Sequence, residues 1–597
     1  MKINMKTTRH TTNQRGWAAS VFAARHDRHG TPPRPPLASS LAALLGLLIL
    51  AAPRAASAQF AYVATNSAVT ITGYTDTNAA VVIPEVIEGL PVTQIGDFAF
   101  YFLESIRSLS IPASVTNIGS DAFEYCTGLT NVVLGENVAS LRAWAFSGCS
   151  GLTNLTLPNR LASIGDYAFA YCTRLSDILL PGSVTNLGTG VFASCSKLVS
   201  IGVTAGNPSF SSADGVLFDH AQTTLVQFPV GRSGTYTLPA SVIRIADSAF
   251  DGARGLSHVV IPDGVCEIGI GAFSNCRGLA GITLPATLTH LGIRAFSYCT
   301  NLSAADLPDS LTHIGDGPFA NCSSLTAIRV GTGNPAYRCV DGVLFDLPQT
   351  RLLQYPVGKP GPYTVPSGVT HLGSSAFMGA RSLTQLTLPE TLTDLGDWVC
   401  ARCSSLPGIV IPNQVRAISA SAFQGCGSLA GLALGTNVAR IGVQAFAGCP
   451  SLTNVTIPQS VQAIQNWAFS VGQNLAGVFF QGPPPNLEAG AFDACPGATA
   501  YYLPGVPGWS TNYGGLPTKL WNPSVWTRDP AFGVRAGHFG FTIAGTADIP
   551  VVVEGCTDLR QPAWQPVQSG SLTNGQFSFR NPAPSVGNAR FYRVRWP

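Results

Sequence analysis

Hydrophobic positions recur along this chain with a 23-residue period. Ala-Phe pairs mark the period, and within each run the phenylalanines follow one another at this step. The series fills fifteen slots: Phe100, Phe123, Phe146, Phe169, Phe192, Phe250, Phe273, Phe296, Phe319, Phe377, Cys400, Phe423, Phe446, Phe469 and Phe492. Because self-similarity at a fixed period is the signature of stacked repeats, this pattern predicts a repeat architecture.

Two steps in the series are longer than the others. The steps from Phe192 to Phe250 and from Phe319 to Phe377 are equal, and each exceeds the normal step by a 35-residue unit. The extra stretches match each other, since the residues at 214–219 (DGVLFD) recur at 341–346. We therefore expect two 35-residue inserted units, and a block of about four coils plus one insertion that was duplicated.

A single coil, read from Leu152, runs LTNLTLPNRLASIGDYAFAYCTR. Its leucines Leu152, Leu155 and Leu157 follow an L-x-x-L-x-L spacing, whose last four residues alternate as in a short strand that buries one face. Further on, Phe169 and Cys172 lie three residues apart, which predicts one helical turn with both side chains on the inward face. One coil cannot bury this surface alone, so equivalent coils must stack at about 4.8 Å, the spacing of paired strands.

These residues resemble the BspA-like, Treponema-type leucine-rich repeats, whose pattern is close to L-x-x-L-x-L-P-x-x-[VL]-x-x-I-G-x-x-A-F-x-x-C. The resemblance extends from about Ile83 to Trp521. It implies a curved solenoid on secreted or surface proteins that bind other proteins or host and matrix surfaces, and it brings no catalytic residues. The expected fold is a leucine-rich repeat solenoid of short parallel strands and short helical turns in 23-residue coils, followed by a small C-terminal all-β domain.

The N-terminal region reads as an export signal. A basic stretch precedes the apolar run Leu37 to Ala52, and Ala56-Ser57-Ala58 supplies a cleavage site, so we expect a signal peptide over 1–58 and a mature chain from Gln59. The alternative is a membrane anchor, although the 16-residue run is shorter than the roughly 20 residues that span a bilayer. Export places the protein outside the cell or at the cell surface.

Three further regions follow the signal peptide. Residues 59–83 are rich in Val, Thr and Tyr and predict an N-terminal β cap, and residues 84–523 form the solenoid with its two inserted units. From 524 to 597 the period is lost, and short alternating strands between Gly, Pro and Asn turns predict a β-sandwich-like domain. Cell-surface attachment and a plain structural appendage are both open roles for that domain.

Composition narrows the function classes. Only 11% of the residues are charged, against roughly 25% in ordinary soluble domains, and 46% are apolar, which excludes an intrinsically disordered chain. The net charge of +3 is too small for a nucleic-acid binder. Without residues 1–58 the chain keeps 26 basic and 30 acidic residues, so its basicity belongs to the export signal.

Most of the cysteines belong to the repeat. Eleven of the fifteen follow a slot by three residues, at a position that Ala253, Ala380 and Gly472 also occupy, so the position selects a small side chain. The expected arrangement is a buried ladder of thiols; some disulfides between coils are the alternative. Cys400 and Cys403 form the one C-x-x-C pair, and without a second pair at zinc-site spacing they predict no metal site.

Three histidines share another position of the repeat. His290, His313 and His371 each stand two residues before the turn glycine, and Glu267 holds this position one coil before His290. Two histidines and a carboxylate could ligate a metal. Since the same position elsewhere holds Asn, Ser, Asp and Arg, we expect an exposed column of interchangeable residues, and we assign no metal or cofactor to the chain.

The outward strand positions on the concave surface offer the candidate binding face. They hold few charges, scattered singly as Arg107, Asp177, Asp306 and Arg329, and no catalytic constellation. The candidate residues are Thr130, Asn131, Thr153, Asn154, Thr384, Gln385, Thr453 and Asn454.

The sequence therefore predicts a non-enzymatic, secreted or cell-surface protein that binds a protein, or a surface glycan, through this face. The alternative is an envelope or matrix spacer without a discrete ligand. No nucleic-acid partner is expected, and membrane contact would come only from an anchor.

Overall fold

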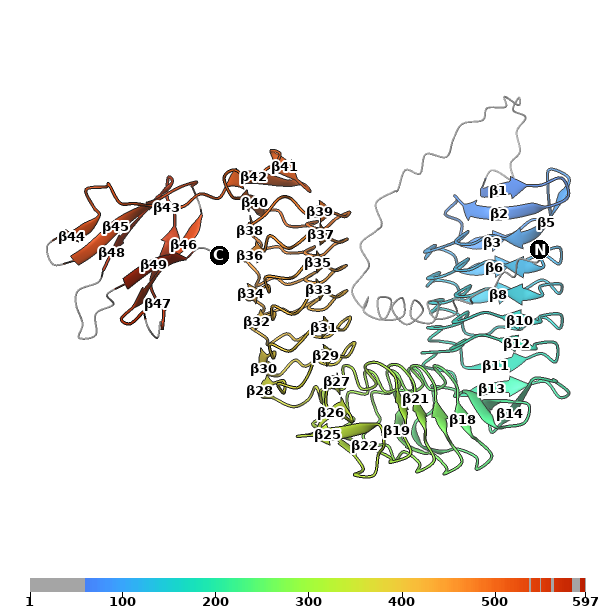
Figure 1. The fold of residues 1–597 in the computed structure, drawn as a ribbon. Helices are drawn as coiled ribbons and strands as arrows, with labels where there is room; N and C mark the ends of the chain where they lie inside the picture. Colours follow the sequence, from blue (N-terminus) through green and yellow to red (C-terminus); the bar gives the residue numbers. More distant parts are fainter. Residues whose placement is uncertain (1–58, 536–537, 548, 560–562, 582–590, 596–597) are drawn as a thin grey trace, which may run out of the picture. The chain divides into compact units, whose positions relative to one another are not determined.

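The computed structural model describes residues 59–535, 538–547, 549–559, 563–581 and 591–595. The predicted signal peptide lies outside these residues. Nearly all of the described chain belongs to one compact unit made of Tyr62–Gly73 and residues 77 onward, in which consecutive coils stack on one another (Figure 1). The coils confirm the predicted 23-residue solenoid, and small antiparallel sheets follow it at the C-terminal end.

One side of the coils carries a face of short parallel strands, which we call the strand face. Inward and outward residues alternate along it: in β11, Ile178 and Leu180 are buried while Asp177 and Leu179 are exposed. Partner residues lie one coil apart, as Asp177 and Ser200 do. The strands are β3 (Ala80–Val82), β6 (Ser108–Ser110), β8 (Asn131–Val133), β11 (Asp177–Leu180), β13 (Ser200–Val203), β17 (Gly234–Thr237), β19 (Leu256–Val260), β22 (Ala304–Leu307), β24 (Ala327–Val330), β28 (Gly361–Thr364), β30 (Leu383–Thr387), β32 (Gly408–Val410), β34 (Gly431–Ala433), β36 (Asn454–Ile457), β38 (Gly477–Phe480), β40 (Thr499–Tyr502) and β42 (Leu516–Leu520).

A second parallel ladder, the short ladder, follows the strand face in each coil. Most of its strands have two residues, of which the second points inward, as Ile164 does. The members are β2 (Val69–Tyr74), β5 (Leu90–Ile95), β7 (Asn117–Ile118), β9 (Ser140–Leu141), β10 (Ser163–Ile164), β12 (Asn186–Leu187), β16 (Thr224–Gln227), β18 (Arg244–Ile245), β20 (Glu267–Ile268), β21 (His290–Leu291), β23 (His313–Ile314), β27 (Arg351–Gln354), β29 (His371–Leu372), β31 (Asp394–Leu395), β33 (Ala417–Ile418), β35 (Arg440–Ile441), β37 (Ala463–Ile464) and β39 (Asn486–Leu487). At the N-terminal end, β1 (Phe60–Ala64) is the neighbour of β2, and β4 (Val86–Ile87) pairs with β5.

The third side of each coil is a turn segment centred on the phenylalanine slot. The sequence predicted a helical turn here, but the described residues contain no helix. Instead, Tyr167 and Tyr171 adopt left-handed backbone angles (φ 55° and 60°) on either side of Phe169, and residues two before and two after the slot do so at all fifteen slots. The backbone N–H groups of Tyr167, Phe169 and Tyr171 thereby reach carbonyls of the next coil at 2.9–3.0 Å.

The phenylalanine and cysteine positions confirm the predicted core. Neighbouring slot rings stack at 4.6–5.8 Å between centroids, as Phe146 and Phe169 do at 5.6 Å. All fifteen cysteines are free thiols. Each of the eleven slot cysteines donates its S–H to the slot carbonyl of the preceding coil, Cys172 to Phe146 at 3.3 Å for example. Cysteine therefore supplies a hydrogen bond that alanine in the same position lacks.

Each inserted unit adds a β-hairpin and also contributes one aromatic ring that stacks on the ring of the following slot. The hairpins are β14 (Phe210–Ala213) with β15 (Val216–Asp219) and β25 (Tyr337–Val340) with β26 (Val343–Asp346). Phe228 and Tyr355 then stack on the following slot rings at 4.9 and 5.0 Å. Buried Asn207 fixes the first hairpin by donating to two carbonyls of the preceding coil at 2.9 and 3.1 Å, and Asn334 does the same at the second.

The turn segments continue across both insertions. The N–H of Ser194 donates to the carbonyl of Asp251 at 2.9 Å, and that of Asn321 donates to Met378 at 2.9 Å, so the coils before and after each inserted unit touch directly on this side. The Tyr167 hydroxyl adds a 2.8 Å hydrogen bond to Ser248. Each inserted unit thus widens the strand side of the stack without adding a turn segment.

Two small antiparallel sheets follow the last coil. Their inward side chains, among them Ile543, Val551 and Phe579, share one hydrophobic cluster with Phe479 and Trp521. This cluster is separate from the core of the solenoid, to which the neighbouring inward side chain of Phe480 belongs. The strands are β41 (Asn512–Tyr513), which pairs with β42, then β43 (Ser524–Trp526), β44 (Gly533–Arg535), β45 (His538–Ala544) and β48 (Gln576–Arg580) in one sheet, and β46 (Pro550–Cys556), β47 (Gln565–Ser571) and β49 (Phe591–Arg595) in the other.

Candidate functional site

The strand face is interrupted where the short ladder is continuous. The short ladder runs through β5, β7, β9, β10 and β12 without a gap, whereas on the strand face the sheets end after β8 and begin again at β11. The coil between them, residues 154–157, forms no strand, although its sequence matches the repeat pattern fully. Within the described chain, the N–H groups of these four residues form no hydrogen bond, and Leu155 is only half-buried.

Comparable interruptions occur elsewhere on the strand face. Three of them follow β8, β19 and β30, which end at Val133, Val260 and Thr387 and are therefore evenly spaced along the chain. After β19, only one isolated bridge joins Val260 to Thr283 in the next coil. After β30, the pairing with β32 is missing, and a further break outside this spacing separates β34 from β36. Because the spacing equals that between the two inserted units, the interruption is a regular feature of this solenoid.

Grooves open on the strand face beside β8 and between β30 and β36. One of about 680 Å³ lies between β8 and residues 154–157, and one of about 380 Å³ lies between those residues and β11. The amide side chains of Asn131 and Asn154 line the first, and Asn154 also lines the second. An amide offers two N–H donors and a carbonyl acceptor, so both grooves can hydrogen-bond a polar ligand.

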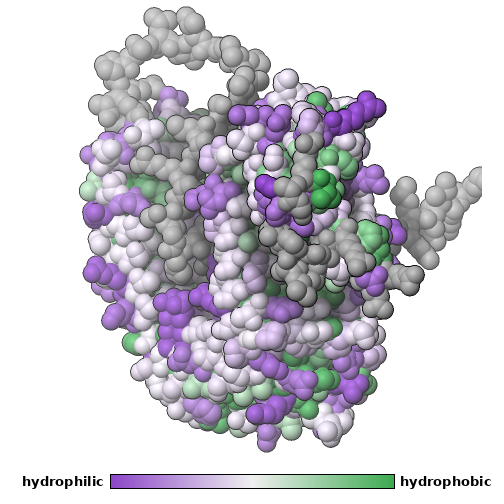
Figure 2. Space-filling model, turned by 90° about the vertical axis from the view of Figure 1, so that its left-hand side faces the viewer, coloured by the Kyte–Doolittle hydropathy of each residue, from purple (hydrophilic) through white to green (hydrophobic). Residues whose placement is uncertain are grey.

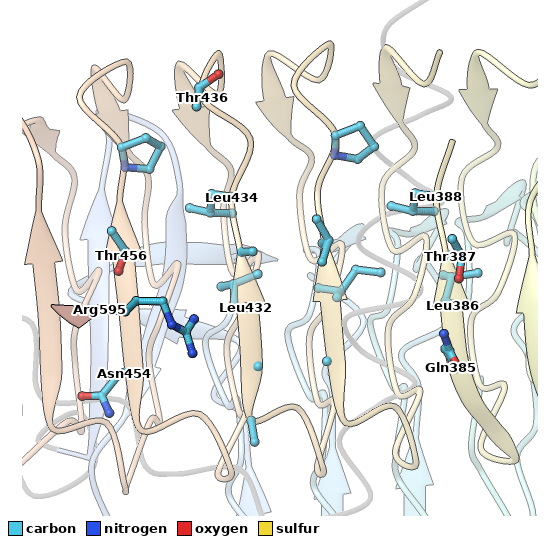
Figure 3. Close-up of a pocket in the computed structure, with 18 of the residues that line it drawn as sticks. Gln385, Leu386, Thr387, Leu388, Leu432, Leu434, Thr436, Asn454, Thr456 and Arg595 are labelled. Carbon is cyan, nitrogen blue, oxygen red and sulfur yellow. The ribbon is translucent and has the colours of Figure 1, made fainter. Parts of the chain in front are cut away.

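A third groove, of about 970 Å³, spans the strand face from β30 to β36 (Figure 3). Leu388, Leu432 and Leu434 lie in the spaces between neighbouring strands, while Gln385 and Asn454 mark the polar ends. This groove is therefore largely apolar. Arg595 of β49 also lines it.

The small residues at the floor of the third groove were missed by the sequence analysis. Gly408 and Gly431 stand where other coils carry the asparagine of a Thr-Asn pair, and Pro407 and Ala430 replace the threonine. The two glycines are paired across β32 and β34. The sequence signal is the loss of Thr-Asn in two successive coils, which removes side chains from the face and leaves the space that forms the groove.

The eight predicted binding residues all lie on the strand face. Seven are exposed and Asn454 is half-buried. Five of them line the three grooves, namely Asn131, Asn154, Gln385, Thr453 and Asn454. Thr130 donates its hydroxyl to the carbonyl of Arg107 at 3.0 Å, so toward a ligand it can act only as an acceptor.

The sequence suggested that the charges on this face are isolated from one another, but two of them form a pair. Arg329 forms an ion pair with Asp306 at 3.0 Å, because the two occupy equivalent outward positions of β24 and β22. Asp177 accepts a hydrogen bond from Ser176 at 2.6 Å. The one-period spacing between Asp306 and Arg329 is the signal that would have predicted the pair.

Burial controls the thiol chemistry of the core. Desolvation raises the pKa of Cys126 and of Cys195 to about 12. The buried thiols therefore remain protonated and unreactive at neutral pH.

In the described part of the chain, no group of three or more His, Cys, Asp or Glu side chains is arranged to hold a metal ion. Among the same residues, no helix has the length and apolar character to cross a membrane.

Several solved structures of bacterial repeat proteins resemble this chain. A leucine-rich repeat protein from Bacteroides ovatus is 22% identical over 78% of this chain and 98% of its own, with a TM-score of 0.31. A leucine rich cell surface protein from Faecalibacterium prausnitzii is 22% identical over 76% and 97%, with a TM-score of 0.30. The leucine-rich repeat protein of T. pallidum is 29% identical over 37% and 89%, with a TM-score of 0.27.

Among curated proteins, no sequence matches the chain. The family model of the BspA type leucine rich repeat region, in six copies, matches residues 93–214, 233–335 and 362–499, more than half of the chain. The matched stretches contain the slot series and most of both the short ladder and the strand face. With the coil geometry described above, they identify the chain as a member of the BspA type leucine-rich repeat family.

Proposed function

We propose that this chain is an exported, non-enzymatic repeat protein that binds a protein ligand through its strand face. The observation that carries the proposal is the set of grooves on that face, which coincide with interruptions of the strand ladder and are lined by five of the eight residues expected to bind. Support for export comes from the N-terminal charge and hydrophobicity pattern and its A-x-A site.

The lining of the grooves favours a protein over a glycan as the ligand. No aromatic ring lines any of the three grooves among the described residues, whereas sugar rings usually pack on aromatic side chains. Leucines and asparagines side by side suit a polypeptide, which presents apolar side chains and backbone hydrogen-bonding groups together. Figure 2 shows one side of the molecule, on which hydrophilic, near-neutral and small hydrophobic areas are mixed.

A spacer without a discrete ligand is the alternative role. The ladder interruptions argue against it, because a rod built only for length gains stability from continuous pairing on every side. Cell fractionation with an antibody to the chain tests the export part of the proposal. Recovery in the cytoplasm would contradict it, and recovery in the envelope or medium would support it.

The binding part is tested by site-specific photo-crosslinking in the producing cells and in the medium that they meet. A photoreactive residue at Asn131 or at Asn454 probes the grooves, and one at Asn186 is the control. Asn186 follows Thr185 on the short ladder, so it keeps the same Thr-Asn pair but lies outside all three grooves.

We expect one protein adduct that forms from the groove positions and not from Asn186. Combined Asn131→Ala and Asn154→Ala substitutions should weaken capture of the same ligand at Asn454, because a ligand that follows the face contacts several grooves. Equal adducts from Asn131 and Asn186 would contradict binding through the strand face. An absence of any adduct from an exported chain would favour the spacer.

A further inference from the structure

Two histidine rings of the short ladder lie face to face on the surface of the solenoid. His290 of β21 and His313 of β23 are paired in register, and their ring centroids are 4.4 Å apart with an interplanar angle of 3°. Both side chains are exposed. The sequence predicted an exposed column of interchangeable residues at this position; the structure adds the orientation of the two rings and of their nitrogen atoms.

Neighbouring threonines determine which nitrogen of each ring carries the proton. Nδ1 of His290 is 2.8 Å from the hydroxyl of Thr289, and that of His313 is 3.0 Å from Thr312. Each threonine has a single hydroxyl hydrogen, and it donates to a carbonyl of the preceding coil, at 3.0 Å from Thr289 and 3.4 Å from Thr312. With this hydrogen on the carbonyl, the hydroxyl oxygen accepts from the ring, and we infer that Nδ1 is the protonated nitrogen.

The same threonine bond forms where no histidine follows. Thr116 and Thr393 occupy the equivalent position before Asn117 and Asp394, and both donate to the carbonyl of the preceding coil, at 3.3 and 3.0 Å. The direction of this bond is therefore a property of the ladder and not of the histidine. It follows that in the neutral imidazoles of His290 and His313 the lone pair is on Nε2, the nitrogen that commonly ligates metal ions.

We propose that His290 and His313 form a two-histidine binding site for a divalent transition metal such as Zn²⁺. Imidazole nitrogen suits zinc, copper and nickel. With Zn–N bonds of about 2.0–2.1 Å, two nitrogens of a tetrahedral site are about 3.3 Å apart. In the structure the two rings are nearly parallel, so their Nε2 lone pairs do not yet converge; binding one metal requires the rings to turn toward each other, which the torsions of exposed side chains permit.

The residues on either side leave the remaining metal positions open. Glu267 precedes His290 in the ladder, but its carboxylate forms an ion pair with Arg244 at 3.2 Å. On the other side, the backbone N–H of Ile314 in the His313 strand is bonded to the hydroxyl of Tyr337 at 2.9 Å. The two imidazoles are thus the protein ligands, and water or a donor group from another molecule completes the coordination.

His371 provides a matched control within the same chain. It occupies the same position of the ladder, and its Nδ1 lies 2.8 Å from Thr370, whose hydroxyl donates to a carbonyl at 3.3 Å. Its ladder partners, however, are Arg351 and Asp394, so no second imidazole lies beside it. His371 therefore has the same tautomer and exposure without the pair.

The test titrates Zn²⁺ into the full-length chain by isothermal calorimetry, and follows the histidines by ¹⁵N NMR. We compare the parent with His290→Ala, His313→Ala and His371→Ala. Since Cys266 is an exposed thiol and could bind zinc by itself, Cys266→Ser is a further control. The substituted histidines are exposed, so circular dichroism should show an unchanged fold in all variants.

We expect the affinity of one zinc site to fall at least tenfold in His290→Ala and in His313→Ala, and to stay unchanged in His371→Ala and Cys266→Ser. The ¹⁵N shifts should report Nδ1 protonation in all three histidines, and zinc should shift Nε2 of the pair alone. Equal affinity in all variants would overturn the proposal. So would a similar loss in His371→Ala, or Nε2 protonation in the pair.

Discussion

The turn side and the strand side of this solenoid are connected in different ways. On the turn side, backbone hydrogen bonds, stacked rings and hydrogen bonds donated by cysteine thiols join coil to coil. The backbone hydrogen bonds continue even across the inserted units. On the strand side, the ladder breaks after β8, β19 and β30, which are evenly spaced, and again after β34. This difference indicates that the turn side holds the stack together. The strand side can therefore lose ladder pairing and form grooves.

High pH should break the turn side, and this is the largest effect we expect. Thiols ionise near pH 9.0 in the unfolded chain, whereas burial raises the pKa of Cys126 and Cys195 to about 12. Above pH 9 the folded chain therefore holds more protons, and the free energy of unfolding falls as pH rises from about 9 to 12, by up to about 1.4 kcal/mol per pH unit for each such thiol.

Thermal unfolding followed by circular dichroism at pH 7, 9, 10 and 11 measures this loss. The control is a variant in which the four thiols of the first block, Cys126, Cys149, Cys172 and Cys195, are all replaced by alanine. Its dependence on pH should be shallower than that of the parent. An identical dependence in the two proteins would show that the buried thiols do not set the alkaline limit.

Removing one ring from the stack should have the next largest effect. Phe146→Ala deletes a fully buried ring between Phe123 and Phe169, and we expect a cost of about 3–5 kcal/mol in the free energy of unfolding. Leu155→Ala, in an interrupted strand where the side chain is half-buried, should cost less than about 2 kcal/mol. Urea unfolding compares them, and equal costs would mean that both sides hold the stack alike.

Hydrogen exchange should separate the two kinds of strand without any substitution. The N–H groups of residues 154–157 form no hydrogen bond within the described chain, whereas β13 is paired with β11 along its whole length. We expect peptides covering 154–157 to exchange at least tenfold faster than peptides covering 200–203, as measured by mass spectrometry. Equal protection would indicate that the ladder is continuous in solution.

A single thiol should contribute the smallest of these effects. Cys172→Ala removes the S–H bond to the carbonyl of Phe146, but that carbonyl keeps the N–H of Cys149 at 3.2 Å. We expect a loss of about 1 kcal/mol in urea unfolding. Cys266→Ala, at an exposed cysteine, serves as the control and should leave stability unchanged. If Cys172→Ala left the free energy of unfolding unchanged, the position would require only a small side chain and not the thiol hydrogen bond.

The sequence predicts the coil well because each buried position is specified by residue type. Phenylalanine, cysteine and the alternating leucines mark the inward positions directly, whereas the burial of Glu124 and Asp251 in the turn segments was not expected. The left-handed turns could not be predicted, since Trp144, Tyr167 and Arg294 have no preference for such backbone angles. Their conformation is imposed by hydrogen bonds to the next coil, which the sequence of one coil does not contain.

The candidate site was predictable only in part for a related reason. Exposure of Asn131 and Asn154 follows from the alternation of the strand, but the grooves beside them come from a missing ladder. Residues 152–158 match the strand pattern fully and yet form no strand. Nothing in their residue types explains the interruption, which therefore arises from the way in which successive coils stack.

The hydrogen bonds of the turn segments run from coil to coil, parallel to the direction of stacking. In mechanical terms, a pull along the solenoid stretches these bonds directly, and at each interrupted strand the turn side and the short ladder carry the whole load. A chain fixed at one end and held by a ligand at the other would lengthen first at those coils. The interrupted coils are then compliant links in a stiffer rod.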